Sequence, residues 1–335
     1  MLKFGIIGFG YWGPNLVRVF SQAPGSKVVK VADAVERNRA RAANLYPNLT
    51  VHADARELID DPAIDAIAIA TPVSTHFELA AAALKAGKHV LVEKPLCATA
   101  AESTQLLDIA DKAKRQIAVD HTFVYTGSVR RIKEMTDRGE LGRILYYDST
   151  RINLGLFQRD VNVLWDLVVH DVAILDNVMP ERPSAVSAMT LDPLGSAQHS
   201  IAYFTLFYPS GAVAHVHASW LAPVKLRRVI FGGDKSMVVY DDLDPSEKIR
   251  IYDKGIEFVR DPAKEMAMKV EYRIGDMRAP AIDTKEALVV MADHINDSFM
   301  NNRPAMTSGE VGHRVTRMLE MADQSARAQG RVLNL

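Results

Sequence analysis

The chain contains a single cysteine, Cys97, among its 335 residues. One thiol cannot form an intrachain disulfide, so the fold must rest on its core. No apolar run reaches the ~20 residues that a transmembrane helix needs. The first residues, MLKFGIIGFG, also lack the basic region, apolar region and cleavage site of a signal peptide. These absences together favour a soluble cytoplasmic protein.

An excess of charge of either sign is also missing. Lys and Arg number 40 against 41 Asp and Glu, which gives a net charge of −1 and a pI of about 6.8. Without a long basic block, the chain is not expected to bind nucleic acid. The hydrophobic content of 48% over 335 residues is enough for about two domains.

The first third of the chain alternates between apolar strands and amphipathic helices. The strands are expected at residues 3–8, 27–33, 63–72, 88–95 and 116–122. The helices are expected after residue 13 and at residues 36–45, 75–87 and 101–114. Strands that alternate with helices predict βαβ units around a parallel sheet.

A glycine-rich turn lies between the first strand and the first helix. Its sequence is Gly8-Phe9-Gly10-Tyr11-Trp12-Gly13, with the spacing G-x-G-x-x-G. The first glycine permits a tight turn, the second lets a pyrophosphate approach the backbone, and the third allows close helix–strand packing. The pattern alone also fits a turn that binds nothing, so the surrounding residues must decide.

Asp33 provides that context. It follows the second strand about 20 residues beyond the last glycine, where an acid accepts hydrogen bonds from an adenosine ribose. Its charge would repel a 2′-phosphate, so NAD is expected rather than NADP. Arg37 nearby can soften that preference.

After residue 122 the alternation stops. A helix is expected at 124–142, a strand at 143–155, a helical segment up to Pro180, and then several strands separated by turn signals. Two helices follow, at about 284–301 and 308–328. We therefore expect an α/β protein with a Rossmann dinucleotide-binding domain at 1–122. A C-terminal α+β domain with a large, mostly antiparallel open sheet is expected at 123–335.

The stretch VLWDLVVHD, residues 163–171, places Asp166 and His170 four residues apart in an apolar run. On a helix this spacing puts both side chains on one face. The flanking residues make a buried helix more plausible than a solvated ion pair. A zinc site would need further ligands, and His215-x-His217 is more typical of strand histidines, so no metal is expected. A catalytic pair and a hydrogen-bonded core histidine both stay open on these residues alone.

Three motifs in order resemble the Gfo/Idh/MocA family, named for glucose-fructose oxidoreductase, inositol dehydrogenase and a rhizopine-catabolism protein. They are the Gly8–Gly13 loop, Glu93-Lys94-Pro95 and Asp166-x-x-x-His170, and the resemblance covers essentially the whole chain. Thr71-Pro72 followed by His76 is similar to the family's nucleotide-side loop. Asn162-Val163 and Val168 stand where the family usually has glycine, which suggests a particular subfamily. YWGPN, NVLWDL and SWLAPVKLRR look like members associated with nucleotide sugars.

The resemblance implies an NAD(H)-dependent oxidoreductase. It would transfer a hydride between nicotinamide and a secondary alcohol or ketone of a sugar, cyclitol or nucleotide sugar. Lys94 is expected beside the nicotinamide, with Pro95 cis and Glu93 supporting the loop. His170 would act as general base or acid, and Asp166 would orient the substrate or the imidazole. Asp171 is expected to make a structural bond. The expected cofactor-binding residues are Gly8, Phe9, Gly10, Tyr11, Trp12, Gly13, Asp33, Arg37, Thr71, Pro72, His76, Glu93, Lys94 and Pro95.

The sequence offers further candidates. The side chains expected to contact substrate are His121, Tyr125, Arg151, Asn153 and Arg159. Lys225, Arg227 and Arg228 fit either a diphosphate or an exposed strand, while Trp220 fits either the core or a sugar platform, and Cys97 fits packing. A homodimer or homotetramer through the C-terminal sheet is expected. Two rival functions are an NAD-dependent glycosidase of the same family and a nucleotide-sensing regulator without catalysis.

Overall fold

The computed structural model describes residues 1–155, 160–196, 198–259 and 269–335. The chain divides into two compact units. The first comprises Met1–Thr126 with Lys285–Glu320, and the second comprises Gly127–Thr284 with Met321–Leu335. The first unit thus takes in residues 285–320, which the sequence pattern groups with the second half. The domains 1–122 and 123–335 stay a prediction.

A parallel sheet forms the centre of the first unit. Its strands are β1 (Leu2–Ile7), β2 (Ser26–Ala32), β3 (Thr50–His52), β4 (Ala66–Ile69), β5 (His89–Glu93) and β6 (Ile117–Asp120). They are hydrogen-bonded in the order β3-β2-β1-β4-β5-β6. The order reverses between β1 and β4, and ligands of open α/β sheets bind outside the carboxyl ends of the strands at such a point.

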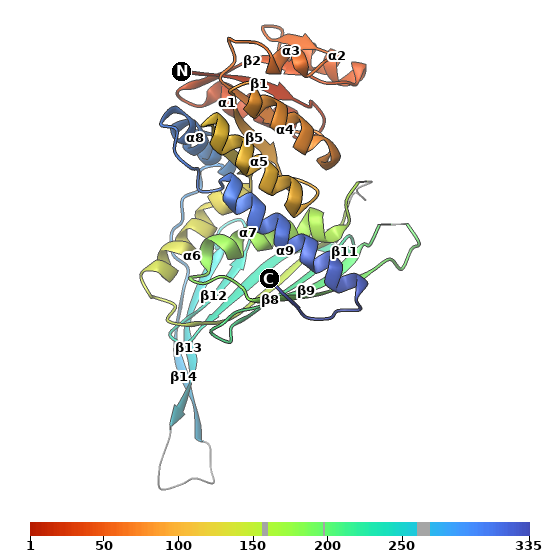
Figure 1. The fold of residues 1–335 in the computed structure, drawn as a ribbon. Helices are drawn as coiled ribbons and strands as arrows, with labels where there is room; N and C mark the ends of the chain where they lie inside the picture. The colour runs from red at the N-terminus through yellow and green to blue at the C-terminus, as the bar shows by residue number, and fades with distance from the viewer. Residues whose placement is uncertain (156–159, 197, 260–268) are drawn as a thin grey trace. The chain divides into compact units, whose positions relative to one another are not determined.

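Helices connect these strands (Figure 1). They are α1 (Gly13–Gln22), α2 (Glu36–Leu45), α3 (Arg56–Ile59), α4 (His76–Lys85) and α5 (Ala100–Ala113), with 3₁₀ turns η1 (Val73–Thr75) and η2 (Thr122–Tyr125). α1 buries Leu16, Val17 and Phe20, and Pro14 occupies its first turn, where a missing N–H costs little. Thr99 and Glu102 form a capping box that starts α5.

Two further helices come from the end of the chain. α8 (Ala287–Met300) belongs to the first unit, and α9 (Gly309–Arg327) continues across the division after Glu320. In the described ranges, none of the helices has the length and hydropathy to span a bilayer.

The predicted parallel sheet is confirmed, but β4, β5 and β6 are shorter than the strands predicted at 63–72, 88–95 and 116–122. The strand predicted at 63–72 begins only at Ala66, because Asp61 holds the preceding residues in a turn. Its carboxylate accepts from the Ala63 N–H at 2.8 Å, and its carbonyl accepts from the Ile64 N–H. The short elements β3 and α3 carry too few residues to show a period and were not predicted.

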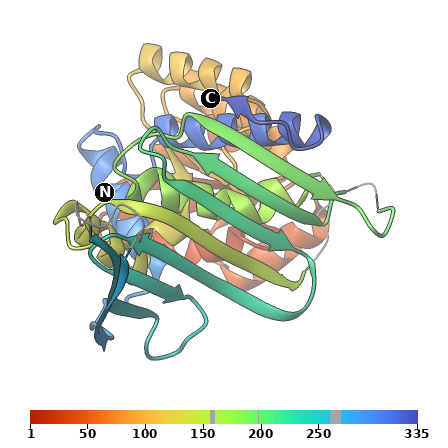
Figure 2. The same cartoon turned by 90° about the horizontal axis from the view of Figure 1, so that it is seen from below.

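A nine-stranded sheet dominates the second unit (Figure 2). Its strands are β7 (Ile144–Leu154), β8 (Ala185–Leu191), β9 (Ile201–Phe207), β10 (Val213–Ser219), β11 (Leu221–Gly233), β12 (Met237–Asp241), β13 (Ile249–Val259), β14 (Lys269–Arg278) and β15 (Leu333–Asn334). The order is β14-β13-β12-β11-β7-β10-β9-β8-β15. β7 and β10 pair in parallel, whereas the other described pairs are antiparallel, which confirms the mostly antiparallel sheet.

Two helices of this unit pack against each other, α6 (Gly127–Asp137) and α7 (Val169–Val178). A π-helical turn, Leu164–Val168, leads directly into α7. The helical segment predicted here is confirmed, and its first turn is π-helical: Asp166 lies in the π turn and His170 in the first turn of α7. The run is apolar on nearly all sides, so its polar residues do not mark the helical period. A change from α- to π-helical geometry therefore could not be predicted from it. π-helical turns are rare and occur frequently at functional sites.

Candidate active site

The glycine loop at the end of β1 has the geometry of a dinucleotide turn. Gly8 has φ +96°, and a Cβ there would overlap the Ala70 carbonyl of the loop after β4. A Cβ on Gly13 would overlap the Gly8 carbonyl, so this glycine lets α1 approach β1. At Gly10 a Cβ would meet no atom within 4 Å. Gly8 and Gly13 thus serve the fold, whereas Gly10 leaves room for a ligand.

Asp33 is fixed just beyond the end of β2. Its Oδ2 accepts from the Phe9 N–H at 2.6 Å and its Oδ1 accepts from the Val35 N–H at 2.7 Å. The Asn38 amide donates to Oδ2 at 3.1 Å. A carboxylate oxygen accepts about two hydrogen bonds, so Oδ1 retains capacity for a ribose hydroxyl. Arg37 is exposed in the first turn of α2.

The aromatic residues of the loop differ in exposure. Phe9 is buried and contacts Tyr46 edge to face. Tyr11 is 77% and Trp12 39% exposed, and the two rings meet edge to face at 5.3 Å. Two large exposed rings at the switch point of the sheet are available to cover a bound ligand.

His76 ties the loops after β4 and β5 together. The ring is buried, with Nδ1 at 2.9 Å from the Pro95 carbonyl oxygen and Nε2 at 2.9 Å from the Thr71 carbonyl oxygen. The Lys94–Pro95 peptide bond is cis, as predicted. The described contacts make His76 and Thr71 supports of the loop, and Pro72 begins the turn that follows.

Glu93 and Asp120 end two adjacent strands. They are register partners of β5 and β6, and both are buried. Burial first, and then the charge of Asp120 and a hydrogen bond with it, raise the pKa of the Glu93 carboxyl well above its ordinary value. Lys94, which follows directly, is half-buried. The carboxyl ends of β5 and β6 thus bring two acids and one cation together.

His121 and Tyr125 follow β6. Both are buried, and the Tyr125 hydroxyl lies 2.9 Å from the Thr307 hydroxyl. Burial raises the Tyr125 pKa. These contacts give Tyr125 a structural role, and its predicted contact with substrate stays a prediction.

In the second unit, the Trp220 indole N–H donates to Asp166 Oδ2 at 3.0 Å. Trp220 is fully buried, so it is a core residue whose one polar atom orients this acid. Asn162 starts the π turn by accepting from the Leu164 N–H at 2.9 Å. Asp323 of α9 accepts from the Asn162 amide at 2.9 Å and from the Trp165 indole at 2.6 Å. Asp166 is therefore held on a segment that is itself anchored at two points.

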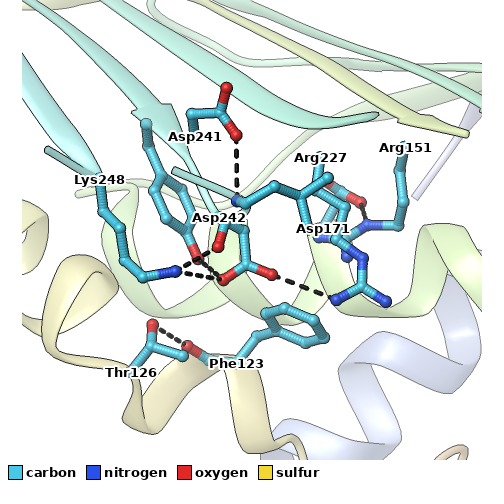
Figure 3. Close-up of polar contacts among 10 residues, drawn as sticks. Phe123, Thr126, Arg151, Asp171, Arg227, Asp241, Asp242 and Lys248 are labelled. Carbon is cyan, nitrogen blue, oxygen red and sulfur yellow. Dashed lines mark hydrogen bonds and ion pairs between the residues drawn. The ribbon is translucent and has the colours of Figure 1, made fainter. Parts of the chain in front are cut away.

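Asp171, next to His170, is the centre of a buried network, and Figure 3 shows its ion pair with Arg151. Its carboxylate accepts from Tyr147 Oη, Ser149 Oγ and Arg151 Nε, each at 2.6 Å. The three donors alternate along β7 and so face α7 from one side of the sheet. This agrees with the expected structural role of Asp171. Arg151, which was expected to contact substrate, is buried and donates its Nε–H to Asp171. Direct substrate binding by Arg151 stays a prediction.

The remaining candidates are dispersed. Asn153 is half-buried near the end of β7. Arg227 donates to Asp242 at 3.2 Å, as Figure 3 shows, and Lys225 and Arg228 are exposed on the same strand. Arg159 lies outside the described residues. In the part of the chain that is described, no three His, Cys, Asp or Glu side chains gather as a metal site.

Two further residues concern packing. Val168, which stands where the family usually has glycine, is fully buried in the π turn. Cys97 is also buried, and burial raises the pKa of its thiol, which agrees with the packing role expected for it. Neither side chain is available to a ligand in this structure.

Sequence reasoning missed Asp120, the donors Tyr147 and Ser149, and the anchors Asn162 and Asp323. One signal was present: Tyr147, Ser149 and Arg151 alternate with period two opposite an apolar helix that carries an acid. The pairing of Asp120 with Glu93 gives no local signal, because it depends on strand register.

A glycine-rich loop at the switch point of a β3-β2-β1-β4-β5-β6 sheet, with an acid after the second strand, defines a dinucleotide-binding protein. A model described as an oxidoreductase family with an NAD-binding Rossmann fold matches residues 2–121, and the GFO/IDH/MocA C-terminal domain matches residues 129–239. The chain belongs to the GFO/IDH/MocA family and is an NAD-binding oxidoreductase, which confirms the predicted family, enzyme class and cofactor.

Individual relatives support this placement. The chain is 31% identical to the uncharacterized oxidoreductase YdgJ of Escherichia coli K12 over 74% of this chain and 73% of that protein. It is 26% identical to UDP-N-acetylglucosamine 3-dehydrogenase of Acidithiobacillus ferrooxidans over 94% of both. A levoglucosan dehydrogenase in complex with NADH and L-sorbose has the same fold, with a TM-score of 0.82, 22% identity and coverage of 99% and 98%.

Proposed function

We propose that this oxidoreductase acts on a secondary alcohol or ketone of a sugar, a cyclitol or a nucleotide sugar. The observation that carries the proposal is Asp166, oriented by the buried Trp220 indole, on the π turn that leads into His170. The near full-length similarity to a UDP-N-acetylglucosamine 3-dehydrogenase supports the substrate class. Nothing in the geometry favours a glycosidase or a regulator.

The residues of the glycine loop fit the cofactor. Gly10 has open space where a pyrophosphate would approach, α1 begins at Gly13 just after it, and Asp33 would bind the ribose. When bound, NAD supplies the acceptor or donor of the hydride. Phe9, Tyr11, Trp12, Thr71, Pro72, His76, Glu93 and Pro95 would shape or support this site.

Each proposed catalytic side chain has one task. In alcohol oxidation, His170 removes the hydroxyl proton, since imidazole titrates near neutral pH. Lys94 donates a hydrogen bond to the reacting oxygen and stabilises its developing charge. Asp166 orients the hydroxyl or the imidazole while Trp220 holds the carboxylate. The reverse reaction uses the same groups with His170 as the acid.

The proposal also covers the substrate contacts and the assembly of the chain. His121, Tyr125, Arg151 and Asn153 are proposed to line the substrate site or to support it. Tyr203 of β9 is 42% exposed and stacks on His217. The face of the sheet seen in Figure 2 carries no helix in the described chain. We propose that this face joins copies of the chain into a homodimer or homotetramer in the cytoplasm, which sedimentation analysis would test.

The experiment is a panel of sugars, cyclitols and nucleotide sugars, screened first by thermal shift with NAD and then by NADH formation. At least one compound should raise the Tm further than NAD alone and should reduce NAD with release of the corresponding ketone. Binding of NADH with no turnover on the whole panel would contradict the proposal. Release of a free sugar without net NADH would point to a glycosidase instead.

A further inference from the structure

Glu93 and Asp120 form a buried pair of acids that the proposed mechanism does not use. They lie directly opposite each other at the ends of β5 and β6, and both are almost fully buried. Glu93 Oε1 and Asp120 Oδ2 have no hydrogen-bond partner among the described residues. Two ionised carboxylates cannot donate to each other, so a proton is the simplest partner for these two oxygens.

The number of protons follows from the surroundings. Two buried negative charges on neighbouring strands repel each other, and each would have lost its hydration. Two neutral acids are also disfavoured, because nearby groups stabilise an anion. The Thr122 hydroxyl donates to Asp120 Oδ1, and the charge of Lys94 favours the ionised form of both residues. One proton and one negative charge satisfy both conditions.

The position of the proton is also indicated. Burial is the main cause that raises the pKa of both carboxyls, but the hydrogen bonds from Thr122 and Glu93 oppose it at Asp120. At Glu93 the charge of Asp120 and the hydrogen bond with it add to the effect of burial. The Thr122 hydroxyl donates to Asp120 Oδ1 and so favours the anion at Asp120, which leaves Glu93 as the acid that donates to it.

We propose that Glu93 and Asp120 share one proton, held on Glu93, and that together they present a single negative charge to Lys94. The pair is a positioning element for the Lys94 ammonium, and this role rests on the function proposed above for Lys94. The other titratable groups around the pair are His121 and Tyr125 on its own side and His76 across the Pro95 carbonyl. These groups stay unchanged in the variants below.

The proton is tested by infrared difference spectroscopy at neutral pH. Glu93→Gln replaces the donor O–H by an amide N–H of nearly the same shape. The wild-type protein should show the C=O band of a buried carboxylic acid, and this variant should lack it. Absence of the band in the wild type would mean that both acids are ionised, and its persistence in the variant would mean that Asp120 is also protonated. Either result overturns the proposal without any reference to activity.

Unfolding measured from pH 5 to pH 9 gives a second test. A carboxyl whose folded pKa is raised keeps a proton that the unfolded chain releases, so its contribution to stability falls as pH rises above the ordinary value of 4.5. The folding equilibrium of Glu93→Gln should therefore improve relative to wild type by up to about tenfold per pH unit. A constant ratio across this range overturns the shared proton.

The role of the charge is tested by pH profiles of kcat/KM. Glu93→Gln keeps the Asp120 anion, and its profile is the reference for the two double variants. Adding Asp120→Asn removes the last negative charge, so the basic limb should move to lower pH by roughly one unit or more. Adding Asp108→Asn instead, an exposed residue of α5, changes the net charge equally and is the control. An unmoved limb in the first double variant overturns the role assigned to the charge.

Discussion

The two units bury acidic side chains in opposite ways. In the second unit, Asp171 accepts three hydrogen bonds, one of them from the guanidinium of Arg151. In the first unit, Glu93 and Asp120 face each other, and Lys94 beside them is the near cation. An acid that is paired with a buried arginine has a structural role. Two acids that share a proton can instead interact with a charged group next to them. Burial alone does not distinguish the two arrangements, but their donors do.

Arg151→Ala removes the ion pair with Asp171 and should have the largest effect of these variants, on the stability of the fold. It leaves Asp171 buried without its cation, and breaking a buried ion pair typically costs about 3–5 kcal/mol. Urea unfolding should show this loss in the free energy of unfolding. Lys133→Ala, which removes an exposed ion pair with Asp137, should cost less than about 1 kcal/mol and is the control. Equal losses in the two variants would mean that the network contributes no more than a surface pair.

Trp220→Phe tests an acid that is less buried than Asp171. Asp166 is half-buried and accepts a hydrogen bond from the Trp220 indole. A hydrogen bond to a charged group contributes about 1.5–3 kcal/mol, so kcat/KM should fall roughly ten- to a hundredfold. Tyr240→Phe removes a hydrogen bond to Asp242, an acid outside the proposed site, and is the control. Steady-state kinetics that show the same loss in both variants would contradict a specific role for Trp220.

Asp33→Asn should have the smallest effect of these variants, on cofactor preference. It extends the comparison to an acid whose hydrogen-bond donors are all uncharged. The amide keeps an acceptor for Val35 or Phe9 but loses the charge that repels a 2′-phosphate. The preference for NADH over NADPH should fall by about tenfold, which is ~1.4 kcal/mol. Fluorescence titration with both cofactors measures the ratio. Asp54→Asn changes an exposed acid that accepts from the Arg56 N–H, and it should leave this ratio unchanged.

Local rules account for what the sequence predicted well. The spacing Gly8-x-Gly10-x-x-Gly13, the acid at Asp33 and the proline after Lys94 act within a few residues of where they stand, and the structure agrees with each of them. The resemblance to a family added the cis peptide bond and the chemical roles. The roles of Lys94, Asp166 and His170 stay a proposal, since no finding so far tests them.

Contacts between distant segments account for what the sequence did not predict. The bond from Trp220 to Asp166 joins residues 54 positions apart. Asp120 meets Glu93 only because β5 and β6 are neighbours in a particular register. The π turn at Leu164–Val168 lies in a run that is apolar on nearly all sides, and such a run fixes burial but no helical phase.

The most direct test of the account compares NADH binding with turnover in the wild type and in His170→Ala, with Lys94→Ala beside it. With a substrate from the panel, both variants should bind NADH with nearly unchanged Kd, because neither residue holds the pyrophosphate or the ribose. Turnover should fall by at least about a hundredfold, the usual size of a general acid–base contribution. Turnover at the wild-type level in both variants would contradict the assignment of these residues as the catalytic groups.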